Sequence, residues 1–195
     1  MITPPPFVRS CRPWTGLALG ALIVLGACEA VISQARHYGT DVIGRFQYAG
    51  AGRDFTAVIV GNPFSVPDET LGRIVTDAMQ EHHFGAATRF TTTPSANARR
   101  KFRMVMMFDP PVSLAGDTLC GDVAALPPPR ADGRLRLLAA FCAGAYLESE
   151  VAASMPRAAT PDAPAFNAMI GAVMRDLLPT RDPGEEDDCN IVPCQ

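Results

Sequence analysis

The chain has 195 residues, of which 48% are apolar, and this suits one globular domain with little left for a second. Its 18 prolines and 16 glycines indicate long connections between a few regular elements. The formal net charge is −3, and from residue 28 onward it is −5, with 15 basic and 20 acidic residues. A chain without a basic excess lacks the field that attracts nucleic acid, so we exclude nucleic acid as a partner.

The N-terminus has the composition of an export signal. Arg9 and Arg12 occur in a stretch without acidic residues, and residues 15–27 (TGLALGALIVLGA) then form an apolar run of h-region length. This run is too short for a typical membrane-spanning helix, which needs roughly 20 apolar residues. We therefore predict that residues 1–27 are a cleaved signal peptide.

The end of the apolar run resembles the lipobox of bacterial lipoprotein precursors. Leu25, Gly26 and Ala27 place one aliphatic and two small residues directly before Cys28. In that family a lipid is attached to the cysteine sulfur, the signal peptidase cleaves before the cysteine, and the new amino group is usually acylated. The resemblance implies that Cys28 is lipidated and anchors the chain, because several acyl chains together give stable attachment. In enteric bacteria a residue other than aspartate after the cysteine, here Glu29, goes with outer-membrane sorting, so we expect the protein there, facing the periplasm.

Four further cysteines follow the predicted lipidation site, and disulfides persist in exported proteins. Cys120, Cys142, Cys189 and Cys194 allow three pairings. We favour a bond between Cys120 and Cys142, and a second between Cys189 and Cys194 that closes the acidic tail, residues 179–195. The tail pair has no second pair or histidine beside it, so we expect no zinc site and no other metal.

The first part of the mature chain is predicted to lead into a strand and a helix. Residues 28–53 are expected to be a tether between lipid and domain, with a short helix at 30–36. Residues 54–61 (DFTAVIVG) are apolar on both faces, which predicts a central strand. Apolar residues then recur with helical period and indicate a helix over 67–82.

The second part is predicted to contain three more strands and one helix. Residues 101–109 form an apolar strand that a pair of prolines ends. A long loop over 110–133 precedes residues 134–154, for which we favour two strands turning at 143–145. A helix over 145–152 stays open as an alternative, because Ala, Leu and Glu also favour helix.

The clearest helical stripe lies near the C-terminus. Its members are Phe166, Met169, Ile170, Val173, Met174 and Leu177. We expect this helix to end at Leu178, before a proline. Residues 54–178 are thus predicted to form an α+β two-layer sandwich, with two helices packed on one small mixed sheet of about three to five strands. The strands joined by the first helix are expected to be parallel.

Two pairs of acidic residues could serve an envelope hydrolase, because glycosidases use two carboxylates that flank a bond. Asp117 and Asp122 lie in the loop that contains a cysteine, and Glu148 and Glu150 share one face of the predicted fourth strand. This spacing does not distinguish a catalytic pair from solvated acids. The sequence also lacks the GxSxG, HExxH, P-loop and GxGxxG motifs.

Methionines and histidines suggest a copper site, since thioether and imidazole groups select copper. Met104 and Met106 share one strand face, and Met79, His82 and His83 lie at the end of the first helix. Methionine also fills irregular cores, and we favour packing. The histidines are more simply explained as partners of carbonyl groups at the end of the helix.

The chain has one basic cluster, formed by Arg99, Arg100, Lys101 and Arg103. It could bind phospholipid or another anionic envelope surface. We favour the simpler interpretation that these are solvated charges at the start of a strand, where they discourage edge pairing.

The sequence therefore predicts a lipoprotein anchored in the membrane by its N-terminal lipid and facing the periplasm. We expect a non-enzymatic binding or envelope-assembly module without cofactor, with an envelope protein as its candidate partner. An envelope hydrolase and, less favoured, a copper-binding periplasmic protein are the alternatives.

Overall fold

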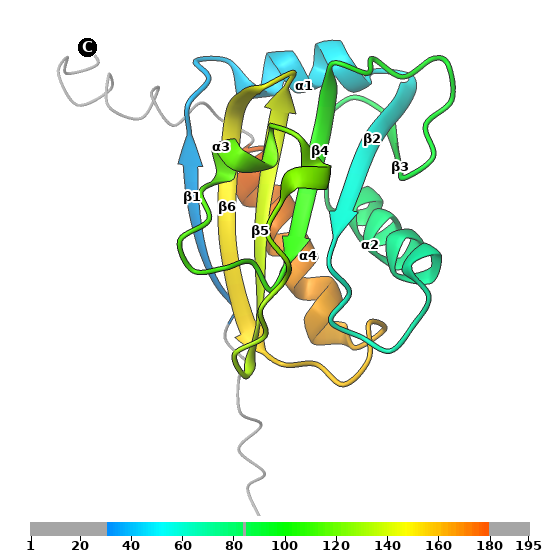
Figure 1. Cartoon of the computed structure of the whole chain (residues 1–195). Helices are drawn as coiled ribbons and strands as arrows, with labels where there is room; N and C mark the ends of the chain where they lie inside the picture. The colour runs from blue at the N-terminus through cyan, green and yellow to red at the C-terminus, as the bar shows by residue number, and fades with distance from the viewer. Residues whose placement is uncertain (1–30, 84, 180–195) are drawn as a thin grey trace, which may run out of the picture.

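A six-stranded mixed sheet organises the computed structural model, which describes residues 31–83 and 85–179 (Figure 1). The strands are β1 (Ile32–His37), β2 (Arg53–Val60), β3 (Thr88–Thr91), β4 (Phe102–Phe108), β5 (Arg134–Ala143) and β6 (Tyr146–Pro156). The helices are α1 (Val42–Gly50), α2 (Asp68–His82), α3 (Gly116–Leu119) and α4 (Pro164–Leu177), with a 3-10 turn at Val123–Ala125. The strand order is β1-β6-β5-β4-β2-β3.

The sheet combines parallel and antiparallel pairs. β2 is parallel to both β3 and β4, and the helix α2 lies in the connection that returns the chain to the same end of the sheet. β4, β5, β6 and β1 pair antiparallel. A tight turn joins β5 to β6, and Gly144 takes a φ of 68° there, which a residue without a Cβ adopts easily. The predicted parallel pair around the first helix and the predicted hairpin of two strands are both confirmed.

The predicted fold, a two-layer sandwich with two helices on three to five strands, is wrong. The sheet has six strands, and two of these, β1 and β3, lie at its edges. Residues 28–53 were assigned to a tether, but β1 pairs with β6 over six residues and α1 places Phe46 in the core. The helix expected at 30–36 is wrong as well, because this segment forms β1.

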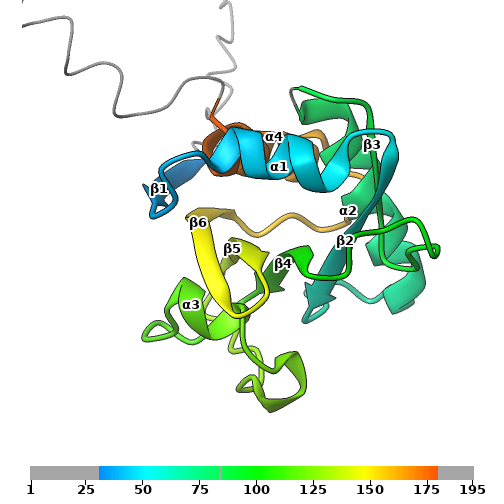
Figure 2. The same ribbon diagram turned by 90° about the horizontal axis from the view of Figure 1, so that it is seen from above.

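Both faces of the sheet are covered, which adds a partial third layer. Figure 2 shows α1, α2 and α4 on one face, and α3 with the connection between β4 and β5 on the other. Alternate side chains of the central strands enter the two cores. The core under the helices includes Met104, Met106, Phe108, Leu137, Ala139 and Phe141. The core under α3 contains Val105, Met107, Leu119, Cys120, Leu138, Ala140 and Cys142.

No helix within residues 31–83 and 85–179 is long and apolar enough to span a membrane.

Four phenylalanines join α1 to the sheet. The ring centroid of Phe46 lies 5.3 Å from that of Phe55, 6.0 Å from Phe90 and 6.4 Å from Phe141. These contacts come from three different strands, and the Phe46 side chain is fully buried. Helix α1 therefore contributes to the hydrophobic core. A helix in a tether between lipid and domain would not.

We expect Phe46→Ala to lower the free energy of unfolding by about 3–5 kcal/mol, because it leaves a cavity among three aromatic rings. Urea denaturation of the purified domain measures the change. Gln47→Ala, which alters an exposed position on the same helix, is the matched control and should change stability little. A loss below about 1 kcal/mol in Phe46→Ala would show that α1 does not contribute to the core.

Candidate functional site

A groove lies between residues 110–115 and the open face of β5, β6 and β1. One hollow of this groove, of about 290 Å³, is lined by Leu138 and Ala152 on the sheet and by Val112 and Leu114 on residues 110–115, which cross the sheet. Two further hollows, of about 200 and 480 Å³, also have Val112 in their linings. We call the three hollows together the strand groove.

The groove arises where a small residue, Ala152, lies between longer side chains on the two neighbouring strands. Ala152 of β6 pairs directly with Gln34 of β1 on one side and with Leu138 of β5 on the other. Side chains of three paired strands project side by side from one face, so a single methyl group between two longer side chains leaves a depression. Val112, which is 86% exposed, stands on the opposite wall. The floor is apolar, as is usual for ligand pockets.

Residues 110–115 form the wall of the groove opposite the sheet, and Asp109 fixes the N-terminal end of this wall. Its backbone has a φ of 48°, a left-handed conformation that aspartate tolerates better than most residues. The buried carboxylate accepts a hydrogen bond from Arg157 Nη2 at 2.8 Å and a longer one from the Arg136 backbone N at 3.3 Å. The backbone carbonyl of Asp109 accepts from Arg130 N at 2.7 Å. One residue therefore holds both the start and the return of the connection between β4 and β5.

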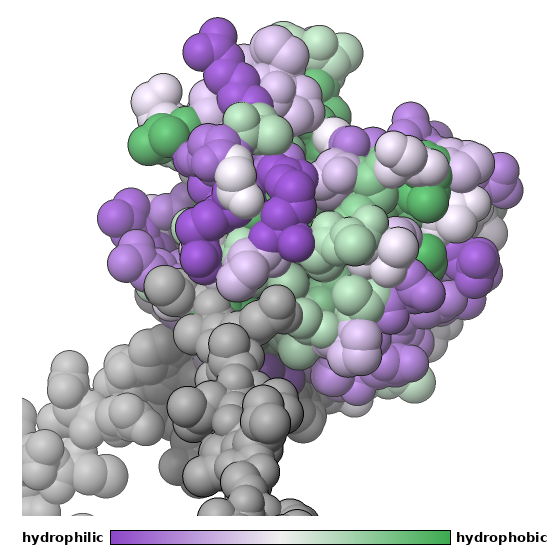
Figure 3. Space-filling view, turned by 90° about the horizontal axis from the view of Figure 1, so that it is seen from below, coloured by the Kyte–Doolittle hydropathy of each residue, from purple (hydrophilic) through white to green (hydrophobic). Residues whose placement is uncertain are grey.

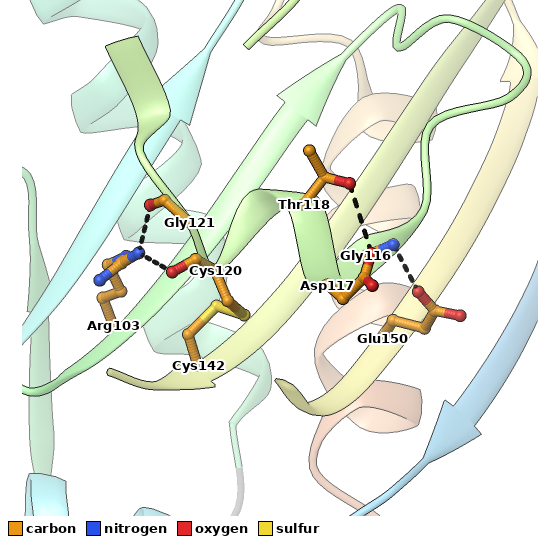
Figure 4. Close-up of a disulfide and its surroundings, with 8 residues drawn as sticks. All are labelled: Arg103, Gly116, Asp117, Thr118, Cys120, Gly121, Cys142 and Glu150. Carbon is orange, nitrogen blue, oxygen red and sulfur yellow. Dashed lines mark hydrogen bonds between the residues drawn. A yellow bond between two sulfur atoms is a disulfide. The ribbon is translucent and has the colours of Figure 1, made fainter. Parts of the chain in front are cut away.

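Glu150 and a disulfide fix the C-terminal end of this wall (Figure 4). The Gly116 backbone N donates to Glu150 Oε2 at 2.8 Å, and a side chain at position 116 would collide with this carboxylate. Tyr38 Oη donates to Glu150 Oε1 at 2.9 Å. The predicted bond between Cys120 and Cys142 is confirmed, with a Cα–Cα distance of 5.4 Å. The predicted Cys189–Cys194 bond lies outside the described residues.

Guanidinium groups border both ends of the groove. The Arg36 side chain is 73% exposed and lies 3.4 Å from Glu150, while Arg136 pairs with Asp132 at 3.2 Å. Partial burial raises the pKa of Tyr38, and its hydrogen bond to Glu150 raises this pKa further. The groove thus combines an apolar floor with two ion pairs at its rim, Arg36 with Glu150 and Arg136 with Asp132.

The four acids proposed for a hydrolase take separate structural positions. Asp117 and Asp122 are exposed, and the Asp122 carboxylate accepts from Ala124 N at 3.0 Å at the start of a 3-10 turn. Glu148 is buried and pairs with Arg45 at 2.7 Å. Glu150 lines the groove, but its contacts with Tyr38 and Gly116 make it a structural anchor. The other three acids are not among the residues that line the groove.

The methionines proposed for copper binding are core residues. Met104 and Met106 share a face, as predicted, and both are fully buried under the helices together with Met79. His82 Nε2 lies 2.9 Å from Asn167 Oδ1, and His83 Nδ1 lies 3.0 Å from the Gln80 carbonyl oxygen. Within the part of the chain that is described, no group of three or more His, Cys, Asp or Glu residues could hold a metal ion.

The basic cluster lies at the end of the sheet where β4 begins and β5 turns into β6, which we call the distal end (Figure 1). The Arg99 guanidinium lies 3.7 Å from the Tyr48 ring centroid. Arg103 Nη2 donates to the carbonyl oxygens of Cys120 and Gly121. Because β4 lies between β2 and β5, the prediction that these charges protect a sheet edge is wrong.

A separate hollow, of about 280 Å³, opens at the distal end between the starts of β2 and β3. Its wall contains Asp54, whose carboxylate accepts two hydrogen bonds from Arg89, at 2.7 and 2.8 Å, and one from Ser95 N at 2.9 Å. The hydrogen bonds from Arg89, followed by those from Ser95, hold the pKa of Asp54 well below its usual range.

The low pKa of Asp54 makes a pH dependence of stability testable. The ionised Asp54 carboxylate stabilises the folded state fully above about 3.9, the pKa of an aspartate in the unfolded chain. This stabilisation is lost as the pH falls through the lower pKa that Asp54 has in the folded state. We expect Asp54→Asn to be less stable than wild type at pH 7. We also expect it to lose less stability than wild type when the pH is lowered below the unfolded pKa of about 3.9. Urea midpoints at pH 7 and at this lower pH measure both effects. Asp77→Asn, at an exposed helical ion pair, is the control. Parallel pH curves for wild type and Asp54→Asn would contradict the assignment.

Comparison with known proteins finds weak structural likenesses. No protein-family model and no curated protein matches the chain. Two crystal forms of the PelC dodecamer from Paraburkholderia phytofirmans, one of them of a point variant, are similar with a TM-score of 0.42 each. They are 13% and 12% identical, and the match covers 77% of this chain and 100% and 99% of theirs. At this TM-score the likeness carries no argument about function.

Proposed function

We propose that this protein is a lipoprotein of the bacterial cell envelope, anchored in the outer membrane through Cys28 and facing the periplasm. The signal-like N-terminus and its resemblance to a lipobox support the anchor. The Cys120–Cys142 disulfide supports export, because such bonds persist in oxidising compartments. The domain acts as a non-enzymatic binding module.

The strand groove is the observation that carries the binding role. An apolar floor around Ala152 and Leu138 suits an apolar group. The guanidinium groups of Arg36 and Arg136 have more N–H donors than their ion pairs with Glu150 and Asp132 use, so they suit a negative group beside the floor. The groove therefore fits an amphiphilic ligand with an apolar portion and an anionic group. The four candidate acids are not assembled into a catalytic pair, so binding is favoured over hydrolysis.

The anchor would hold the domain close to the lipid. Only three residues lie between Cys28 and the start of β1 at Ile32, and the four Cα–Cα steps across them span at most about 14 Å. The end of the molecule where β1 begins would then face the membrane. Figure 3 views this end and shows hydrophilic and hydrophobic areas side by side, a composition suited to a headgroup region. The distal end would point away from the membrane.

Metabolic labelling with a palmitate analogue tests the anchor. We expect the wild-type chain to be labelled and Cys28→Ala to lose the label, because the substitution removes the sulfur that carries the lipid. Cys11→Ala is the matched control, since that cysteine lies in the predicted signal peptide, and it should be labelled normally. Labelling that persists in Cys28→Ala would refute the anchor.

Titration with decanoate, which has an apolar chain and a carboxylate, tests the groove. We expect Ala152→Trp to weaken binding at least about tenfold, because the indole fills the depression between Gln34 and Leu138. Heteronuclear NMR of the folded protein follows binding and confirms that the variant keeps its fold. Ala168→Trp, an exposed position on α4, is the control. Equal affinities in the two variants, or no binding by wild type, would contradict the groove as the site.

A further inference from the structure

The distal end presents cations without ion-pair partners in the described structure. Within residues 31–83 and 85–179, the ion pairs involve Arg36, Arg45, Arg73, Arg89, Arg136 and Arg157. None of these ion pairs includes the four cations that lie close together where β2 and β4 begin, which are Arg53, Arg99, Arg100 and Lys101. Arg53 Nη1 donates to the carbonyl of Asn97, two residues before Arg99.

Exposed tyrosines accompany these cations. Tyr48 is 60% exposed and carries the Arg99 guanidinium over its ring, and Tyr146 is 75% exposed, directly after the hairpin turn. Gly144 N donates to the Lys101 carbonyl at 2.6 Å, so this turn lies beside the basic cluster. Tyrosine and arginine are, with tryptophan, enriched among the residues that carry the binding energy of protein interfaces. We call Arg53, Arg99, Arg100 and Lys101, with Tyr48 and Tyr146, the distal surface.

The end of α4 lies within reach of the distal surface. The Leu177 carbonyl accepts a hydrogen bond from Ser149 Oγ at 2.8 Å. Ser149 is three residues along β6 from Tyr146, a separation of about 10 Å. The six Cα–Cα steps from residue 179 to residue 185 span at most about 20 Å. An acidic run begins at this point, because residues 185–188 read EEDD.

We propose that the distal surface is the docking site of this chain's own acidic segment, residues 185–188. Four carboxylates then face four cations, with the tyrosine rings at the side. Single exposed ion pairs are weak, but a segment tethered this closely acts at an effective concentration of the order of millimolar. The docked segment covers the distal surface and competes with any other anionic partner. This proposal depends on neither the lipid anchor nor the strand groove.

The chain provides a specific test because Lys101 is its only lysine. A carbodiimide joins a carboxylate to an amine only when the two are in contact, so peptide mass spectrometry can find an amide between Lys101 and residues 185–188. The experiment uses the full mature chain with Cys28→Ala, mixed with an equal amount of ¹⁵N-labelled chain. We expect the crosslink within single chains, and its yield should fall at least about fivefold in high salt.

Two matched double variants test whether the surface holds the segment. Arg99→Gln with Arg100→Gln removes two distal cations, and we expect the Lys101 crosslink to fall about fivefold. Arg130→Gln with Arg134→Gln removes two exposed cations at the opposite end of the sheet and should leave the yield unchanged. Circular dichroism confirms that each variant is folded.

Three results would overturn the proposal. The first is no crosslink although Lys101 reacts fully with a small acetylating reagent, which shows that its amine is accessible. The second is a yield that does not change in the Arg99→Gln, Arg100→Gln variant. The third is a crosslink found only between labelled and unlabelled chains, which would assign the surface to a second copy of the protein.

Discussion

The need to cover both faces of the sheet determines the architecture of this protein. Each of β4 and β5 sends apolar side chains in both directions, so neither face tolerates water. Three helices cover one face. The other is covered by the connection between β4 and β5, which buries Leu119 and Cys120 and is fixed by separate bonds at Asp109, Gly116 and Cys120. The strand groove is the place where this cover ends.

The sequence was most informative where the burial pattern is strongest. Continuous apolar runs predicted β2 and β4, and helical stripes predicted α2 and α4, with bounds within one to three residues of those observed. The edge strands were missed because their signals are weak. β1 reads ISQARH, in which polar residues dominate, and β3 has only four residues.

The groove could not be predicted because it depends on register. Gln34, Leu138 and Ala152 become neighbours only when three strands pair in one alignment, and nothing in the sequence of a single strand specifies that alignment. The contacts of the candidate acidic residues could not be predicted from the sequence either. Glu148 and Glu150 were placed two residues apart on one strand, yet their partners, Arg45 of α1 and Gly116 of α3, come from distant segments. Asp109 carried the best signal, as an acid followed by two prolines directly after an apolar strand.

The position of β1 gives the protein a mechanical property. β1 lies at the edge of the sheet, directly after the predicted anchor, and pairs antiparallel with β6 at six positions. Its Ser33 and His37 side chains also bond to Asp176 at the end of α4. A pull on an N-terminal anchor acts along the strand and loads all of these bonds together in shear, whereas a pull across the strand would break them one after another. The domain would therefore resist a tensile force applied at the start of β1 better than the stability of an edge strand suggests.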